Sequence, residues 1–130
     1  MARIVALLDS MWGGEGEAAR YFRISPDNLS GRRLYRLCGD ANLLVTNSCR
    51  EMQQTAGGHG IPDPAWVTEN LKRLEPFELL LVCGRVAWQA YLGVLRDYPK
   101  VLMIDHPAAR RWSNKKLDET TSQIKAMINP

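Results

Sequence analysis

The sequence predicts a three-layer α/β/α protein, in which helices cover both faces of a central, mostly parallel four-stranded sheet. Four short segments are continuously apolar, which is typical of strands buried on both faces. The segments between them carry apolar residues at helical spacing, and this alternation indicates parallel strands joined by right-handed crossovers. A chain of 130 residues has the size of one domain with one core. We therefore expect a single domain over residues 1–130.

The predicted strands are short and lack the polar alternation of a half-exposed sheet. They are Arg3 to Leu8, Leu43 to Asn47, Leu79 to Cys83 and Val101 to Asp105. Spacing alone does not fix their order in the sheet.

The predicted helices follow the same alternation. They are Gly31 to Cys38, Pro64 to Leu74, Arg85 to Val94 and a last helix from about Lys115 to Ile128. Asp63 suits the N-cap of the second helix and Pro64 its first turn. Trp66 and Trp88 fall on apolar helix sides, so we expect both in the core.

The composition is that of an ordinary globular protein, with 45% hydrophobic and 24% charged residues. The formal charge of +3 permits a polyanionic partner without identifying one. No apolar run reaches the roughly 20 residues that span a bilayer, and Asp9 comes too early for a signal peptide. We expect a cytoplasmic protein without a membrane partner.

The cysteines are three, an odd number without a Cys-x-x-Cys pair. Cys38, Cys49 and Cys83 each stand in an apolar stretch. We interpret them as reduced packing residues, which argues against a disulfide framework and a cysteine-bound metal.

Polar residues stand directly after the predicted strands. The first strand is followed by Asp9 and the second ends at Asn47, while Gly84 and His106 follow the third and fourth. Ligands of open parallel sheets bind at the carboxyl ends of the strands. An asparagine there can donate to and accept from the edge of a base, and a histidine can stabilise a departing oxyanion. The sequence therefore predicts one site at this rim.

Four blocks of the sequence resemble the motifs of a known superfamily, in the same order. They are Ser30-Gly31-Arg32-Arg33-Leu34, Val45-Thr46-Asn47, Leu80 to Ala90 and Ile104 to Asn114. These blocks resemble, in turn, a Ser-Gly-Arg-x-Leu helix entry, a strand whose Asn reads the base, a Leu-Gly-Arg/Lys-x-Ala turn, and a His-Pro-Ser loop followed by Arg-x-Trp-x-Asn. The family is the uracil-DNA glycosylase superfamily, particularly its small phage-type members, and the blocks cover about the whole chain.

The resemblance implies a hydrolase of DNA repair in a bacterial or phage-infected cell, which flips a base out of DNA and needs no metal or cofactor. Asp9 and His106 would be catalytic, with Asp9 acting on the water or the sugar and His106 on the departing base. The base would be bound by Asn47, Phe22 and Ser10, with Tyr21 as an alternative stacking residue. The residues implied in DNA binding are Gly84, Arg85, Pro107, Ala108, Arg110, Arg111 and Trp112. The loop from His106 to Trp112 would enter or press the minor groove.

The sequence departs from the family at two motifs. The family's Gly-Glu/Gln-x-Pro-Gly turn corresponds to Leu8-Asp9-Ser10-Met11-Trp12, which has no proline. Ala108 replaces a serine, which removes one phosphate contact. The iron-sulfur cysteines of some bacterial members have no counterpart. These departures bear on catalysis more than on fold.

Each candidate residue also has a structural interpretation. Asp9 suits the cap of a helix that starts near residue 14, and Asn47 suits a turn at a strand end. His106 is alternatively a buried structural histidine. His59 lies in the glycine-rich and proline-rich loop of residues 53–64, which is more typical of a binding loop than of a domain boundary.

The basic residues have two interpretations as well. Arg110 and Arg111 beside Trp112 suit phosphate contact and groove insertion. Lys115 and Lys116 suit phosphate contact and a solvated helix start equally well. A second set of arginines suits a solvated helix face and phosphate contact about equally: Arg32, Arg33 and Arg36.

The leading function is therefore excision of a uracil-type or modified base from DNA by hydrolysis of the N-glycosidic bond. The alternative is a catalytically silent protein of the same fold that binds DNA or a protein partner. A nucleotide-binding domain has weaker support, because residues 13–16 lack the Lys-Ser/Thr of a P-loop.

Overall fold

The computed structural model describes residues 2–9, 22–51 and 60–129. Strands and helices alternate along the chain as predicted. Their bounds are β1 (Arg3–Leu8), α2 (Leu29–Cys38), β2 (Asn42–Asn47), α3 (Pro64–Leu74), β3 (Leu79–Cys83), α4 (Arg85–Leu92), β4 (Val101–Ile104) and α5 (Asn114–Ile128). None of these helices is long and apolar enough to cross a bilayer.

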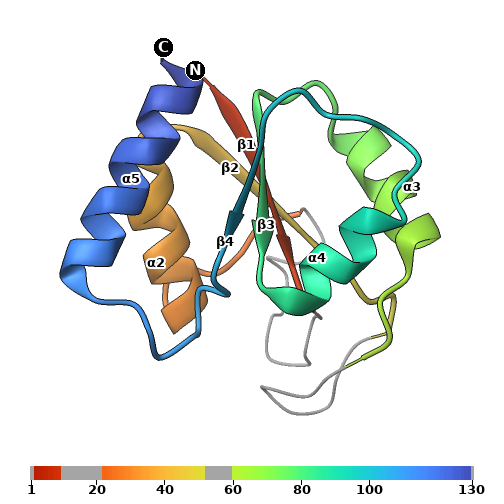
Figure 1. Ribbon diagram of the computed structural model, residues 1–130, viewed down its shortest axis with the longest axis horizontal. Helices are drawn as coiled ribbons and strands as arrows, with labels where there is room; N and C mark the ends of the chain where they lie inside the picture. The colour runs from red at the N-terminus through yellow and green to blue at the C-terminus, as the bar shows by residue number, and fades with distance from the viewer. Residues whose placement is uncertain (1, 10–21, 52–59, 130) are drawn as a thin grey trace.

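The described strands form one parallel sheet in the order β2-β1-β3-β4. Figure 1 shows α2 and α5 on one side of the sheet and α3 and α4 on the other. The predicted three-layer α/β/α fold is confirmed, and the predicted mostly parallel sheet is parallel throughout the described strands.

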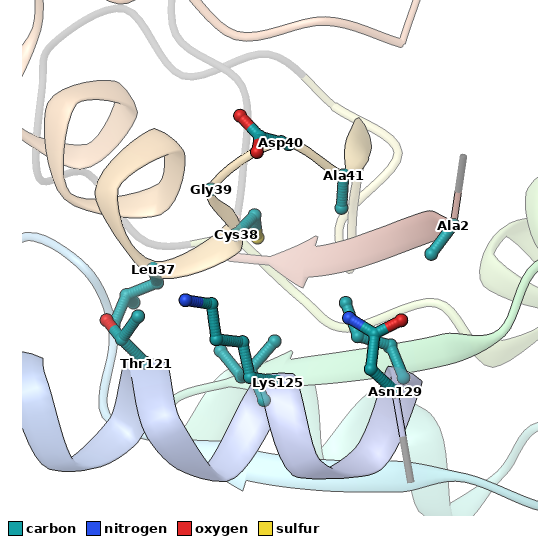
Figure 2. A pocket seen from close by; sticks show the side chains of 11 residues that line it. Ala2, Leu37, Cys38, Gly39, Asp40, Ala41, Thr121, Lys125 and Asn129 are labelled. Carbon is teal, nitrogen blue, oxygen red and sulfur yellow. The ribbon is translucent and has the colours of Figure 1, made fainter.

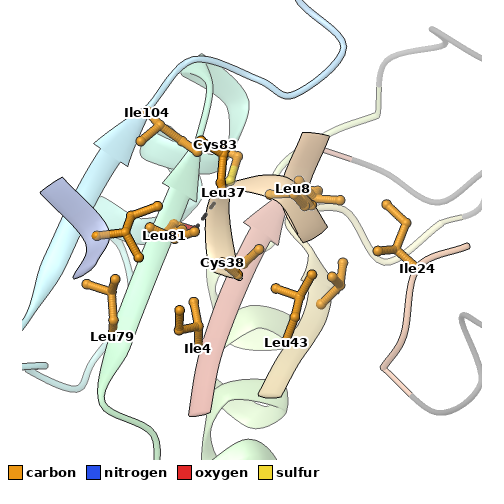
Figure 3. Packing of buried hydrophobic residues seen from close by; sticks show 14 of the residues in the cluster. Ile4, Leu8, Ile24, Leu37, Cys38, Leu43, Leu79, Leu81, Cys83 and Ile104 are labelled. Carbon is orange, nitrogen blue, oxygen red and sulfur yellow. Dashed lines mark hydrogen bonds between the residues drawn. The ribbon is translucent and has the colours of Figure 1, made fainter. Parts of the chain in front are cut away.

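Two apolar cores result from the alternation of side chains along the buried strands. In β1, Ile4 and Leu8 face the α2/α5 side, where Leu37 and Ile124 pack against them. Figure 3 shows this cluster, which continues across the sheet to Ile104. A second cluster of buried residues fills the α3/α4 side: Val5, Leu7, Leu44, Val67, Leu71, Leu74, Leu80, Val82, Ala87 and Ala90. Partly buried Trp66 and Trp88 pack against it, as expected.

Side-chain caps fix where the helices begin. Asp63 accepts a hydrogen bond from the Trp66 amide, which confirms the predicted N-cap of α3. Asn28 accepts from the Gly31 amide, so α2 begins two residues before its predicted start.

The connections of the two central strands leave the sheet in opposite directions. From β1 the chain leads to α2 and outward to β2, whereas from β3 it leads through α4 outward to β4. Ligands of open α/β sheets bind at the carboxyl ends of the strands where this reversal occurs. The topology therefore places the candidate site between the carboxyl ends of β1 and β3.

Candidate functional site

The four strands end at nearly the same level. Leu8 is paired with Asn47, and Cys83 is paired with Ile104. Asp9, Gly84 and the Asp105–His106 pair follow directly, so one edge of the sheet carries them all. With strands about 4.8 Å apart, Asp9 and the end of β4 are separated by about 10 Å across β3.

The end of β1 is fixed by the segment that follows β2. The amides of Ser48 and Cys49 donate to the Asp9 carbonyl at 2.9 and 3.1 Å. The Cys49 thiol lies 3.9 Å from Asp9 Oδ1. These bonds hold the backbone of Asp9 in place. The residue is half-buried, so part of it is accessible at the rim.

Asn47 ends β2 and is half-buried. Among the described residues, none forms a hydrogen bond with its side-chain amide. Its donor and acceptor are therefore available for a ligand at the rim.

Gly84 brings the β3 turn against His106. Its φ is +93°, and an added Cβ would lie 3.2 Å from the His106 Cβ. The Gly84 amide donates to the Ile104 carbonyl at 2.9 Å. Only a glycine combines this backbone conformation with so close an approach. Arg85, at the first position of α4, is exposed.

The ring of His106 is oriented by its own loop. The Ala108 amide donates to His106 Nδ1 at 3.0 Å, so the neutral ring carries its proton on Nε2. The His106 carbonyl accepts from the Ala109 amide and from the Trp112 indole, both at 2.9 Å. His106 is half-buried, whereas the alternative interpretation expects a buried structural histidine.

Trp112 lies in the core and not on the surface. It is 8% exposed and belongs to the α2/α5 cluster. Its indole N–H donates to the His106 carbonyl, and Lys116 Nζ lies 4.9 Å from the ring centroid. This burial corrects the expectation that Trp112 enters a DNA groove: the ring supports the loop from within.

The rest of this loop divides into buried and exposed residues. Pro107 is buried, whereas Ala108, Arg110 and Arg111 are exposed. The two arginines therefore present positive charge in the loop that follows His106. Lys116 forms an ion pair with Asp105, so it is not merely part of a solvated helix start.

Arg33 belongs to the site because it contacts the loop after β4, which the sequence did not indicate. Its Nη1 donates to the carbonyls of Pro107 and Ala109 at 2.6 and 2.9 Å. Of the interpretations of this residue, the solvated helix face does not hold, because Arg33 is half-buried and bonded to the loop. The available signal was its place four residues before buried Leu37, on the inward flank of α2.

Phe22 runs beside β2. Its carbonyl accepts from the Val45 amide at 2.7 Å, two residues before Asn47, and its φ is +58°. Its side chain packs against the α3/α4 core, so base stacking would use a ring that already has core contacts. Ser10, Tyr21 and His59 lie outside the described residues, as does the helix start proposed near residue 14.

All three cysteines are free and buried, as predicted. Burial raises the pKa of Cys38 to about 12. Burial, followed by the Asp9 carboxylate, raises the pKa of Cys49 to about 11. Burial also raises the pKa of Cys83. These thiols are protonated near neutral pH and therefore unsuited to nucleophilic attack or metal binding.

We predict that iodoacetamide at pH 8 leaves all three cysteines unmodified in the folded protein. The reagent attacks thiolates, and pKa values of about 11 and 12 for Cys49 and Cys38 leave almost none at this pH. Mass spectrometry of the intact protein measures the result. The same treatment in denaturant should label three sites, and rapid labelling of Cys49 without denaturant would contradict its buried, protonated state.

A cavity of about 310 Å³ lies at the opposite end of the sheet. Figure 2 shows it between the C-terminal ends of α2 and α5, where Leu37, Cys38 and Lys125 are among the residues that line it. Ala2 and Ala41, which precede β1 and β2, also line it. This cavity is therefore separate from the rim.

Within the described residues, no cluster of histidine, cysteine and carboxylate side chains could hold a metal ion. The sequence matches no known protein family, and no curated protein matches it either.

Proposed function

We propose that this protein is a DNA glycosylase-like hydrolase that binds DNA and removes a uracil-type or modified base. The observation that carries the proposal is the geometry of His106, whose Nδ1 accepts from the Ala108 amide and whose proton is therefore on Nε2. A neutral imidazole that donates from Nε2 is suited to a base oxygen that gains negative charge. The resemblance of the strand-end motifs to the uracil-DNA glycosylase superfamily agrees with this chemistry.

In the proposed reaction, water adds to C1′ of the deoxyribose, and the proton that the water loses finally neutralises the departing base. The bond from C1′ to the base breaks with its electron pair going to the base, and positive charge develops on the sugar. The Asp9 carboxylate stabilises that charge or orients the water, while the His106 N–H stabilises the anionic base. Asn47 would bind the edge of the flipped base, which leaves the stack at a cost of a few kcal/mol.

The charge distribution around the rim supports a DNA substrate. Arg85, Arg110 and Arg111 are exposed on the segments that follow β3 and β4. Guanidinium groups at these positions would contact phosphates on either side of a flipped nucleotide. Binding should therefore weaken as salt increases.

The test is base release from oligonucleotides that carry uracil, hydroxymethyluracil or other modified bases, in single- and double-stranded form. We expect release of at least one base, detected as strand breaks after alkali. Intact oligonucleotides throughout the panel, at enzyme concentrations above those of the DNA, would refute the proposed activity.

Replacing Asn47 with alanine should reduce release of the preferred base about tenfold, since one hydrogen bond to the base edge is lost. Single-turnover rates measure this effect without interference from product release. The matched control is Asn129→Ala, which removes the same amide from an exposed position at the other end of the sheet. Equal rates for the two variants would exclude Asn47 from base recognition.

The second candidate is a catalytically silent protein of this fold that binds DNA or a protein. Two observations favour it: Ala108 stands where the family has a serine, and Trp112 is buried. The substitution Asp9→Asn distinguishes the candidates. It should abolish base release by an enzyme while DNA binding persists, whereas a silent protein has no release to lose.

A further inference from the structure

We propose that Arg33 is a positioning residue that orients the His106 ring through a single peptide group. The Pro107 carbonyl and the Ala108 amide belong to the same peptide bond. Arg33 donates to the carbonyl at 2.6 Å, and the amide donates to His106 Nδ1 at 3.0 Å. The catalytic part of this inference rests on the proposed function, whereas the structural part does not.

The geometry of the peptide bond makes this connection directional. In a planar trans peptide the C=O and N–H bonds point in opposite directions. Fixing the Pro107 oxygen on the guanidinium therefore aims the Ala108 hydrogen away from α2 and towards the imidazole. The second bond of Arg33, to the Ala109 carbonyl at 2.9 Å, holds the Ala109–Arg110 peptide two peptide bonds further along the loop and so limits movement of the Pro107–Ala108 peptide.

Charge strengthens the same connection. A guanidinium bound to a carbonyl polarises the peptide and makes its N–H a better donor, as in other chains of hydrogen bonds. A stronger donor at Nδ1 favours the tautomer that carries its proton on Nε2. Arg33 thus acts on His106 without touching the ring.

Two further contacts hold the loop but do not act on this peptide. Trp112 donates to the His106 carbonyl, and Lys116 pairs with Asp105. Among the described residues, Arg33 is therefore the one whose side chain fixes the plane of the Pro107–Ala108 peptide. That plane determines the direction of the Ala108 N–H.

The test compares Arg33→Met with Arg32→Met by NMR of the folded protein. Arg32 lies on the same helix and also donates to a backbone carbonyl, that of Asp27 at 2.7 Å, away from the loop. In Arg33→Met we expect Ala108 amide exchange at least tenfold faster than in wild type. The two ¹⁵N resonances of the His106 ring should move towards the values of a ring that exchanges between tautomers. Arg32→Met should change neither.

Arg33→Lys keeps the charge but replaces the guanidinium with a single ammonium group. We expect an intermediate acceleration of Ala108 exchange, and this variant also decides the matter if Arg33→Met does not fold. Unchanged Ala108 exchange and ring resonances in folded Arg33 variants would overturn the inference.

Base-release kinetics test the catalytic part separately. If wild type releases a base, Arg33→Met should lower kcat about tenfold with little change in KM, because Arg33 contacts the loop backbone. An altered His106 ring with an unchanged kcat would overturn the catalytic role of Arg33. If wild type releases no base, the proposed function fails while the NMR comparison still decides whether Arg33 positions the ring.

Discussion

Replacing His106 with alanine is expected to lower the rate of base release by at least about a hundredfold. Removal of a single preorganised donor to a developing oxyanion typically costs 10²–10³ in kcat. The donor here is the Nε2–H that results from the bond between the Ala108 amide and Nδ1. Single-turnover cleavage of the oligonucleotide that wild type processes best measures the effect.

The control for this prediction is His106→Gln, because a glutamine amide can donate from near the position of Nε2. It should keep part of the activity that alanine loses. DNA binding should change little in both variants, since the exposed arginines Arg110 and Arg111 are untouched. A rate within threefold of wild type for His106→Ala would remove His106 from the reaction and favour the silent protein.

The sheet could be predicted from the sequence because each strand is apolar on both faces. Val5 and Leu7 face one core while Ile4 and Leu8 face the other, and this pattern is visible as a continuous apolar run. The ends of elements depend on single polar contacts and were less predictable. The predicted fourth strand included Asp105, but this residue pairs with Lys116 and β4 ends at Ile104.

The convergence of the strand ends was also predictable, because parallel strands carry their carboxyl ends to one edge. The packing of the loop after β4 was not. Trp112 stands among basic residues and suggested a groove-inserting aromatic, yet its indole donates to His106 six residues earlier and its ring completes the core. The partners of Arg33 are 74 and 76 residues away, so only the tertiary structure connects this arginine to His106.

Gly31 is expected to be the glycine least tolerant of substitution in the described part of the chain. An added Cβ would lie 1.8 Å from the Ser25 carbonyl oxygen and 2.8 Å from its carbon. In an exposed helix, alanine would be favoured over glycine by about 1 kcal/mol. Here that gain is outweighed, because overpacking costs about 1–3 kcal/mol or more and the obstacle is backbone. With the overpacking cost at the upper end of this range, Gly31→Ala should lose about 2 kcal/mol of unfolding free energy.

Urea denaturation measures this loss, with Ser30→Ala as the control in the same turn of α2. Ser30→Ala should stay within about 0.5 kcal/mol of wild type, and equal stability of the two variants would contradict the close packing of Gly31 on Ser25.

The effect of Gly31→Ala should extend to the candidate site. Relief of the clash requires the start of α2 to move away from Ser25, and Arg33 follows two residues later in the same helix. If the Gly31→Ala variant still folds, we therefore expect faster hydrogen exchange of its Ala108 amide, because the hydrogen bonds from Arg33 to the loop weaken.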